Sequence, residues 1–204
     1  MEKNTKVIIA MGISLIVILL FFMYLSNLNN GSKEIADVSI GFLEPLGSGN
    51  IRVIEFSDFQ CPACKGAEPA VKEIIDEHKE DIEFYYRNFP LEMHENSMIA
   101  ALAGSCANEQ EKFWEYHDLL FANQNNLDKE SLKGYAEQLN LNIDEFNECL
   151  DSKKYKEEVQ KDISDGVKAG VKGTPTFFVN GKKVEGADKD LIEGLIEEEI
   201  GRRS

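Results

Sequence analysis

The chain has 204 residues, of which 43% are hydrophobic, and a formal net charge of −15. That length suffices for one ordinary domain with its own apolar core plus a short appendage, but not comfortably for two domains. The negative charge disfavours contact with nucleic acid phosphates and with anionic lipid headgroups, so nucleic acid is not an expected partner.

The first element is an uncharged apolar run from Val7 to Leu25. As a helix rising about 1.5 Å per residue, this run crosses most of the ~30 Å hydrocarbon core of a bilayer. Lys3 and Lys6 precede it, which favours a cytoplasmic N-terminus, and no small-residue cleavage site follows it. We expect residues 1–26 to form a cytoplasmic stub and an uncleaved, single-pass anchor in the cell membrane, with the rest of the chain outside. A cleaved signal peptide is the alternative.

Residues 27–50 are predicted to be a tether and lead-in that ends in the turn-forming sequence Gly47-Ser48-Gly49-Asn50. The segment from Ile51 to Phe56, in which apolar and polar residues alternate, then predicts a strand. A helix is expected to begin at Pro62, because proline is tolerated in the first helical turn. The segment Ile82–Phe89 predicts a second strand. A strand–helix–strand unit with short joints predicts that the two strands run parallel.

The middle of the chain, about residues 95–170, contains five segments with apolar residues at helical spacing and no convincing strand. We expect it to be a helical subdomain inserted into an α/β core. The segment Thr174–Asn180 returns to a strand pattern, and Asn180-Gly181 predicts a two-residue hairpin turn into Lys182–Glu185. Asp188 is placed to cap a final helix.

The chain has four cysteines, Cys61, Cys64, Cys106 and Cys149. If the domain lies outside the cytoplasm, these thiols meet an oxidising compartment, where disulfides persist. Four cysteines are consistent with one redox-active pair and one structural disulfide. We expect Cys106 and Cys149, which lie on apolar helical faces, to form a structural disulfide between two helices of the inserted subdomain. Two separate buried free cysteines are the alternative.

The sequence Cys61-Pro62-Ala63-Cys64 is the decisive motif. Because Cys61 comes where a strand gives way to a helix, backbone N–H groups and the helix dipole should face its sulfur and lower its pKa below the free value of ~8.5. Cys61 would then be the attacking thiolate. Cys64, one turn further along, would be the shielded thiol that resolves mixed disulfides.

A static disulfide and half of a zinc site are the alternative interpretations of this motif. A zinc site usually needs a second C-x-x-C or closely spaced histidines. Cys106 and Cys149 stand apart, and His78, His94 and His117 are scattered singly. No metal is therefore expected.

Two segments, Glu55–Cys64 and Lys172–Gly181, resemble the motifs of DsbA-like thioredoxin-fold proteins, with C-P-x-C in the first and G-T-P-T in the second. The segment Lys112–Asp118 is also similar. The resemblance covers about residues 51–200 and implies a thioredoxin-like fold with an inserted helical subdomain. Strongly oxidising members of the family carry histidine where this chain has Ala63, so the resemblance leaves the oxidising strength open.

The resemblance also implies roles for three residues outside the cysteine motif. In thioredoxin folds the residue matching Pro175 has a cis peptide bond and packs beside the cysteine pair, so Thr174 would present its backbone to an extended substrate peptide. Glu55 matches a buried acid that handles protons for the inner cysteine. From the residues alone, Thr174-Pro175 is only a strand start with a proline at its edge, and Glu55 could be a solvent-facing glutamate on an edge strand.

The favoured function is an extracytoplasmic thiol–disulfide oxidoreductase that forms disulfides in exported polypeptides, with no cofactor and as a monomer. The resemblance implies a membrane quinone-linked partner that reoxidises it. A reductase or an isomerase is the alternative within the same chemistry, although the chain lacks the added dimerisation domain of dedicated isomerases. A non-catalytic peptide-binding or chaperone module and a metal-binding protein are alternatives of another class.

Overall fold

The computed structural model describes residues 18, 21, 23 and 37–202. The predicted membrane anchor and most of the predicted tether therefore lie outside the described residues. Among the residues that are described, no helix is both long enough and apolar enough to cross a membrane. The fold reported below is that of the unit Ile35–Ser204.

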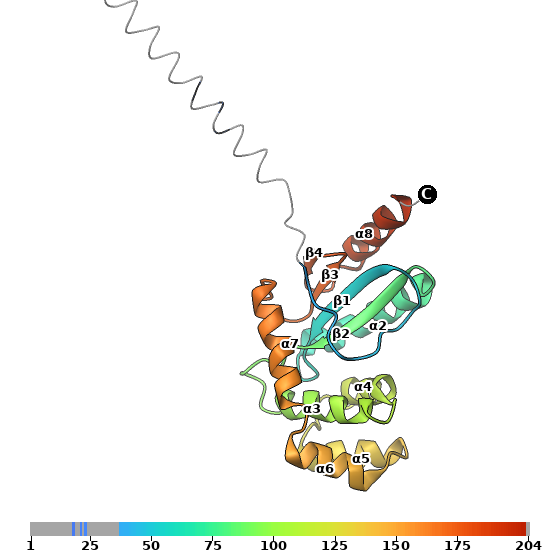
Figure 1. Cartoon of the computed structure of the whole chain (residues 1–204), viewed down its shortest axis with the longest axis vertical. Helices are drawn as coiled ribbons and strands as arrows, with labels where there is room; N and C mark the ends of the chain where they lie inside the picture. Colours follow the sequence, from blue (N-terminus) through green and yellow to red (C-terminus); the bar gives the residue numbers. More distant parts are fainter. Residues whose placement is uncertain (1–17, 19–20, 22, 24–36, 203–204) are drawn as a thin grey trace, which may run out of the picture. The chain divides into compact units, whose positions relative to one another are not determined.

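The described domain is built on a four-stranded sheet with the order β2-β1-β3-β4 (Figure 1). These strands are β1 (Ile51–Ser57), β2 (Ile82–Asn88), β3 (Thr176–Val179) and β4 (Lys182–Glu185). The parallel pairing of β1 with β2, which the strand–helix–strand order predicted, is confirmed. The other pairings are antiparallel, so β1 is a central strand with neighbours on both sides.

One face of the sheet is covered by α2 (Pro62–His78) and α8 (Lys189–Gly201). Side chains alternate between the faces of a strand, so Val53 and Glu55 of β1 both point to this side. The apolar core on this face includes Ile51, Val53, Val71, Ile74, Phe84, Phe177, Ile192 and Ile196. Asp188 caps α8 as predicted, because its side chain accepts a hydrogen bond from the Leu191 N–H at 3.1 Å.

The opposite face packs against α7 (Lys156–Lys168), whose Ile163 contacts this second core. Gly166 lets this helix approach the sheet closely. A Cβ atom at Gly166 would lie 2.8 Å from the ring of Phe89 and 3.0 Å from that of Phe56. The second core is formed by Val38, Ile54, Phe56, Tyr85, Phe89, Val171 and Phe178.

The remaining helices form the inserted subdomain that the sequence predicted. They are α3 (Ser97–Asn108), α4 (Phe113–Ala122), α5 (Lys129–Gln138) and α6 (Ile143–Ser152), and they pack on one another (Figure 1). Their shared apolar core extends to the cysteine motif and to β2 through Phe59 and Tyr86, which stack with ring centroids 5.0 Å apart. The subdomain therefore forms part of the wall around the inner cysteine.

The described part of the predicted lead-in, residues 37–50, packs onto the domain. Leu46 exchanges two backbone hydrogen bonds with Phe84, at 2.9 and 2.8 Å. The indole N–H of Trp114 donates to the Glu44 carbonyl oxygen at 3.1 Å, and Leu43 is buried. These contacts hold Leu43, Glu44 and Leu46 against β2 and α4.

Candidate redox site

The two cysteines of the motif sit at the junction between β1 and α2. Cys61 occupies the N-cap position of α2 and Pro62 is the first helical residue, as the sequence predicted. Both cysteines are free thiols in the structure. Cys61 is 7% exposed, whereas Cys64, one turn into the helix, is fully buried. A substrate can therefore reach the outer sulfur only.

The environments of the two thiols push their pKa values in opposite directions. The hydrogen bond from the Cys64 thiol is the main cause that lowers the pKa of Cys61, to about 5, and backbone N–H groups of α2 contribute. Burial raises the pKa of Cys64, and the interaction with Cys61 and the charge of Glu55 raise it further. Cys61 is thus a thiolate at neutral pH, while Cys64 keeps its proton. Disulfide exchange needs one ionised thiol that reacts with the substrate and one protected thiol that resolves the mixed disulfide.

The loop before β3 lies directly against the outer cysteine. The peptide bond between Thr174 and Pro175 is cis, as the resemblance implied. The Sγ atom of Cys61 lies 3.5 Å from the carbonyl oxygen of Thr174. Ala63, Thr174 and Pro175 are among the residues that line a groove of about 380 Å³. The further lining residues are Lys172, Gly173, Thr176, Glu185, Gly186 and Ala187.

Glu55 is fully buried in the central strand β1, so the alternative of a solvent-facing edge residue does not describe it. It pairs with Tyr86 on β2 and with Phe177 on β3. Neither carboxylate oxygen has a hydrogen-bond partner among the described residues. Burial raises the pKa of Glu55 to about 8, and the nearby Glu68 carboxylate adds to the shift. An acid with that pKa can give or take a proton near neutral pH.

Comparisons with known proteins agree with this geometry. A family model described as Thioredoxin matches residues 48–198. The chain belongs to this thioredoxin family. The domain is similar to the crystal structure of oxidised BdbD from Bacillus subtilis, with a TM-score of 0.73, 28% identity, and coverage of 80% of this chain and 96% of that one. It therefore has a DsbA-like thioredoxin fold, as the motifs predicted.

Two relatives differ in how much of their length the chain covers. It is 28% identical to the probable disulfide bond formation protein D of Bacillus anthracis, over 97% of this chain and 99% of that protein. It is 41% identical over 138 residues to Na(+)/H(+) antiporter NhaA 1 of Salinispora arenicola, which covers 67% of this chain but 21% of the antiporter. The chain thus spans about a fifth of the antiporter relatives it matches, and this family domain occurs both alone and as part of larger proteins.

Two polar residues that the sequence did not single out hold this thioredoxin-family site in place. The side-chain amide of Gln124, just beyond α4, donates to the carbonyl oxygens of Phe59 at 2.9 Å and of Cys61 at 2.8 Å. The buried Asp58 carboxylate accepts from the Leu91 N–H at 2.9 Å and lies 2.7 Å from Nδ1 of His94. No sequence pattern marks Gln124, because its role depends on a contact across more than sixty residues.

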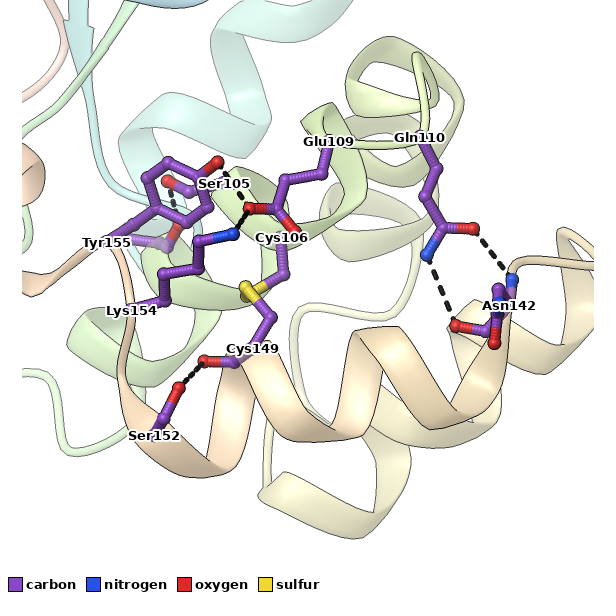
Figure 2. The surroundings of a disulfide bond; sticks show 10 residues. Ser105, Cys106, Glu109, Gln110, Asn142, Cys149, Ser152, Lys154 and Tyr155 are labelled. Carbon is purple, nitrogen blue, oxygen red and sulfur yellow. Dashed lines mark hydrogen bonds and ion pairs between the residues drawn. A yellow bond between two sulfur atoms is a disulfide. The ribbon is translucent and has the colours of Figure 1, made fainter.

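The second cysteine pair lies in the inserted subdomain (Figure 2). Cys106 of α3 and Cys149 of α6 form a disulfide, with an S–S distance of 2.05 Å and Cα atoms 5.9 Å apart. This is the pairing that we expected from the sequence. Both cysteines are buried, so substrate thiols have no direct access to the bond.

Polar contacts reinforce the same junction on both sides of the disulfide (Figure 2). Gln110 exchanges two hydrogen bonds with the backbone of Asn142, at 2.7 and 3.2 Å. The Glu109 carboxylate accepts from the Tyr155 hydroxyl at 2.7 Å and pairs with the Lys154 ammonium. The region around the disulfide is therefore built as a structural joint between α3 and the α6–α7 segment.

Proposed function

We propose that the protein is a thiol–disulfide oxidoreductase that forms disulfides in exported polypeptides through Cys61 and Cys64. The observation that carries the proposal is the asymmetry of the pair. The outer thiol has a pKa of about 5 at a helix N-terminus, and the pKa of the buried thiol is raised. Stabilising the Cys61 thiolate stabilises the reduced protein, which makes the disulfide form an oxidant.

The exchange proceeds in two steps. A substrate thiolate attacks Sγ of Cys61 in the disulfide form, and Cys64 leaves as a thiolate that takes up one proton. The substrate's second thiolate then attacks the substrate sulfur of this mixed disulfide and expels Cys61 as its stable thiolate. The substrate gains a disulfide and loses two electrons, which the Cys61–Cys64 pair receives. Glu55 faces the buried pair and is the acid suited to protonate Cys64.

The groove beside Thr174 and Pro175 is the proposed substrate site. The Thr174 backbone lies next to the outer sulfur, so an extended peptide bound there brings its own cysteine to Cys61. Apart from Lys172 and Glu185, the lining residues have short side chains, which suits binding through the peptide backbone rather than through one side chain. Polypeptides with free thiols are therefore the proposed substrates.

We further propose that the domain works outside the cytoplasm, held to the cell membrane by residues 1–26 through residues 27–50, with residues 51–200 as the catalytic domain. The Cys106–Cys149 disulfide supports an oxidising compartment. The similarity over nearly the whole chain to a probable disulfide bond formation protein supports the oxidase direction. A membrane quinone-linked partner is the proposed reoxidant, and the protein is proposed to act as a monomer without a cofactor.

A single-turnover assay tests this function. Oxidised protein is mixed with an equimolar reduced peptide containing two cysteines, and peptide disulfide is followed by mass spectrometry. The proposal predicts transfer of up to one disulfide per protein, and no transfer by a Cys61→Ala variant. A folded wild-type protein that transfers none would be a non-catalytic peptide-binding module instead.

A further inference from the structure

The groove beside the outer cysteine carries a lysine on its wall. Lys172 is exposed and lines the groove two residues before Thr174, whose carbonyl oxygen lies 3.5 Å from Sγ of Cys61. Two residues of extended chain span at most about 7 Å. The base of the Lys172 side chain therefore lies close to the place that a substrate cysteine must occupy to react with Cys61.

The ammonium group of Lys172 is available to a ligand. No carboxylate of the described residues lies within ion-pair distance of it. The other charged residue of the groove, Glu185, pairs instead with Lys183 at 2.8 Å. The hydrogen bond from Lys183 is the main cause that lowers the pKa of Glu185, and the charge of Lys172 contributes less. Lys172 is thus near Glu185 but free to bind another anion.

These charges make the groove locally positive. Its remaining lining residues are uncharged, and Lys183 neutralises Glu185, so Lys172 leaves one net positive charge there. The whole chain, in contrast, has a formal net charge of −15. Exposed charges farther apart than the Debye length, about 8 Å at physiological ionic strength, are largely screened from one another. A peptide bound in the groove therefore interacts with Lys172 more strongly than with the acidic surface elsewhere.

We propose that Lys172 selects substrates that carry a glutamate or an aspartate within about two residues of the reacting cysteine. The proposal rests on the function proposed above and narrows its substrates from polypeptides with free thiols to this class. An extended peptide that brings its cysteine to Cys61 runs past Lys172, whose ammonium group donates a hydrogen bond to the neighbouring carboxylate. Lys172 contacts the peptide beside the cysteine and not the sulfurs, so it determines specificity and takes no part in the exchange itself.

The expected preference is modest, because ion pairs between exposed groups are weak. Lys172 should favour a peptide with carboxylates beside its cysteine over one with ammonium groups there by roughly threefold. The variant Lys172→Glu should reverse this preference, because it repels the carboxylates and attracts the ammonium groups. The ratio of the two rates should therefore change by roughly tenfold between the wild type and this variant.

Peptide competition on the full chain tests the inference. Two reduced two-cysteine peptides differ only at the positions two before and two after each cysteine, which hold glutamate in one and lysine in the other. Oxidised wild type, Lys172→Glu and Lys156→Glu each receive an equimolar mixture, and mass spectrometry follows both peptide disulfides. Lys156→Glu is the matched control, because Lys156 is also exposed and has no ion pair among the described residues. It begins α7, about 18 Å along that helix from Lys168.

The rate ratio in each variant is divided by the ratio in the wild type, which cancels the intrinsic thiol reactivity of the peptides and any general loss of activity. The inference predicts a roughly tenfold shift toward the lysine peptide in Lys172→Glu, no shift in Lys156→Glu, and a smaller shift in 1 M NaCl, where the Debye length is about 3 Å. An unchanged ratio in Lys172→Glu, or an equal shift in Lys156→Glu, would overturn the inference. A wild type that oxidises neither peptide would overturn the proposed function instead.

Discussion

The side-chain amide of Gln124 donates hydrogen bonds to the carbonyl oxygens of both Phe59 and Cys61, at 2.9 and 2.8 Å. It thereby fixes the backbone of the cysteine motif to the end of α4. The Cys61 carbonyl oxygen also accepts from the Lys65 N–H at 3.2 Å, so Gln124 is one of its two donors. The inserted subdomain thus directly supports the geometry of the reactive thiol.

Replacing Gln124 with leucine should weaken both stability and exchange. The change removes the Gln124 donor from the buried Phe59 carbonyl oxygen, at a cost of about 1–3 kcal/mol, while the Cys61 carbonyl oxygen keeps the Lys65 N–H at 3.2 Å. We expect a clear loss in the free energy of unfolding, measured with urea, and a several-fold loss in the rate of disulfide transfer. Gln138→Ala, on the exposed face of α5, is the matched control and should change neither. A Gln124→Leu variant with full rate and stability would mean that the contact is incidental.

The two cysteines should react in a fixed order. At pH 6 the Cys61 thiol, with a pKa of about 5, is mostly ionised, while Cys64 is protonated and buried. Iodoacetamide should therefore alkylate Cys61 first, as peptide mapping of the quenched reaction will show. Cys64→Ala should trap mixed disulfides with substrate peptides and Cys61→Ala should trap none. First alkylation at Cys64 would reverse the assignment.

Glu55 should make the reduced protein less stable as the pH rises. Its pKa is about 8 in the folded state and near 4.5 in the unfolded chain. Between these two pKa values the Glu55 carboxyl group is protonated in the folded state and ionised in the unfolded chain. Its contribution to the free energy of unfolding therefore declines from about pH 4.5 to pH 8 and is constant above pH 8. Cys61 acts in the opposite direction over the range from about pH 5 to pH 9, because its pKa is lowered. The comparison must therefore be made between reduced wild type and reduced Glu55→Gln.

The Glu55→Gln variant removes one of these two contributions. Relative to the wild type it should gain a few kcal/mol of unfolding free energy between pH 5 and pH 8, which urea titrations at each pH will measure. Exchange should slow at the same time, because the amide cannot pass on a proton. A stability difference that does not change with pH would show that Glu55 titrates normally.

The disulfide between Cys106 and Cys149 should act on stability alone. It joins positions 43 residues apart, for which loop-closure entropy gives roughly 4 kcal/mol. The double variant Cys106→Ala/Cys149→Ala should melt at a clearly lower temperature in calorimetry yet transfer disulfides at a rate close to that of the wild type. Equal loss of exchange in folded protein would mean that this pair relays electrons.

Much of the fold could be predicted from local sequence. The strand–helix–strand unit, the Asn180-Gly181 turn and the Asp188 cap each depend on residues close together in the chain, and the structure has all three. The cysteine motif could be predicted for the same reason. Contacts across the fold could not. Gln124 has no local signature, and its role appears only when α4 meets the motif.

Buried charges outside the motif were missed for a similar reason. The Arg87 guanidinium is fully buried and pairs with Asp162 at 2.8 Å and with Asp165 at 3.0 Å. In the sequence, Asp162 and Asp165 look like the polar face of a helix. Only the packing of α7 on β2 shows that they neutralise an arginine inside the protein.

The reduction potential of the Cys61–Cys64 pair tests the central claim most directly. The protein is equilibrated in glutathione buffers of graded ratio, quenched with acid and alkylated, and the reduced fraction is determined by mass spectrometry. A stabilised Cys61 thiolate predicts a potential well above that of thioredoxin, on the oxidising side of about −180 mV and toward the value of about −120 mV for DsbA. A potential near or below about −270 mV would make the protein a reductase and contradict the account.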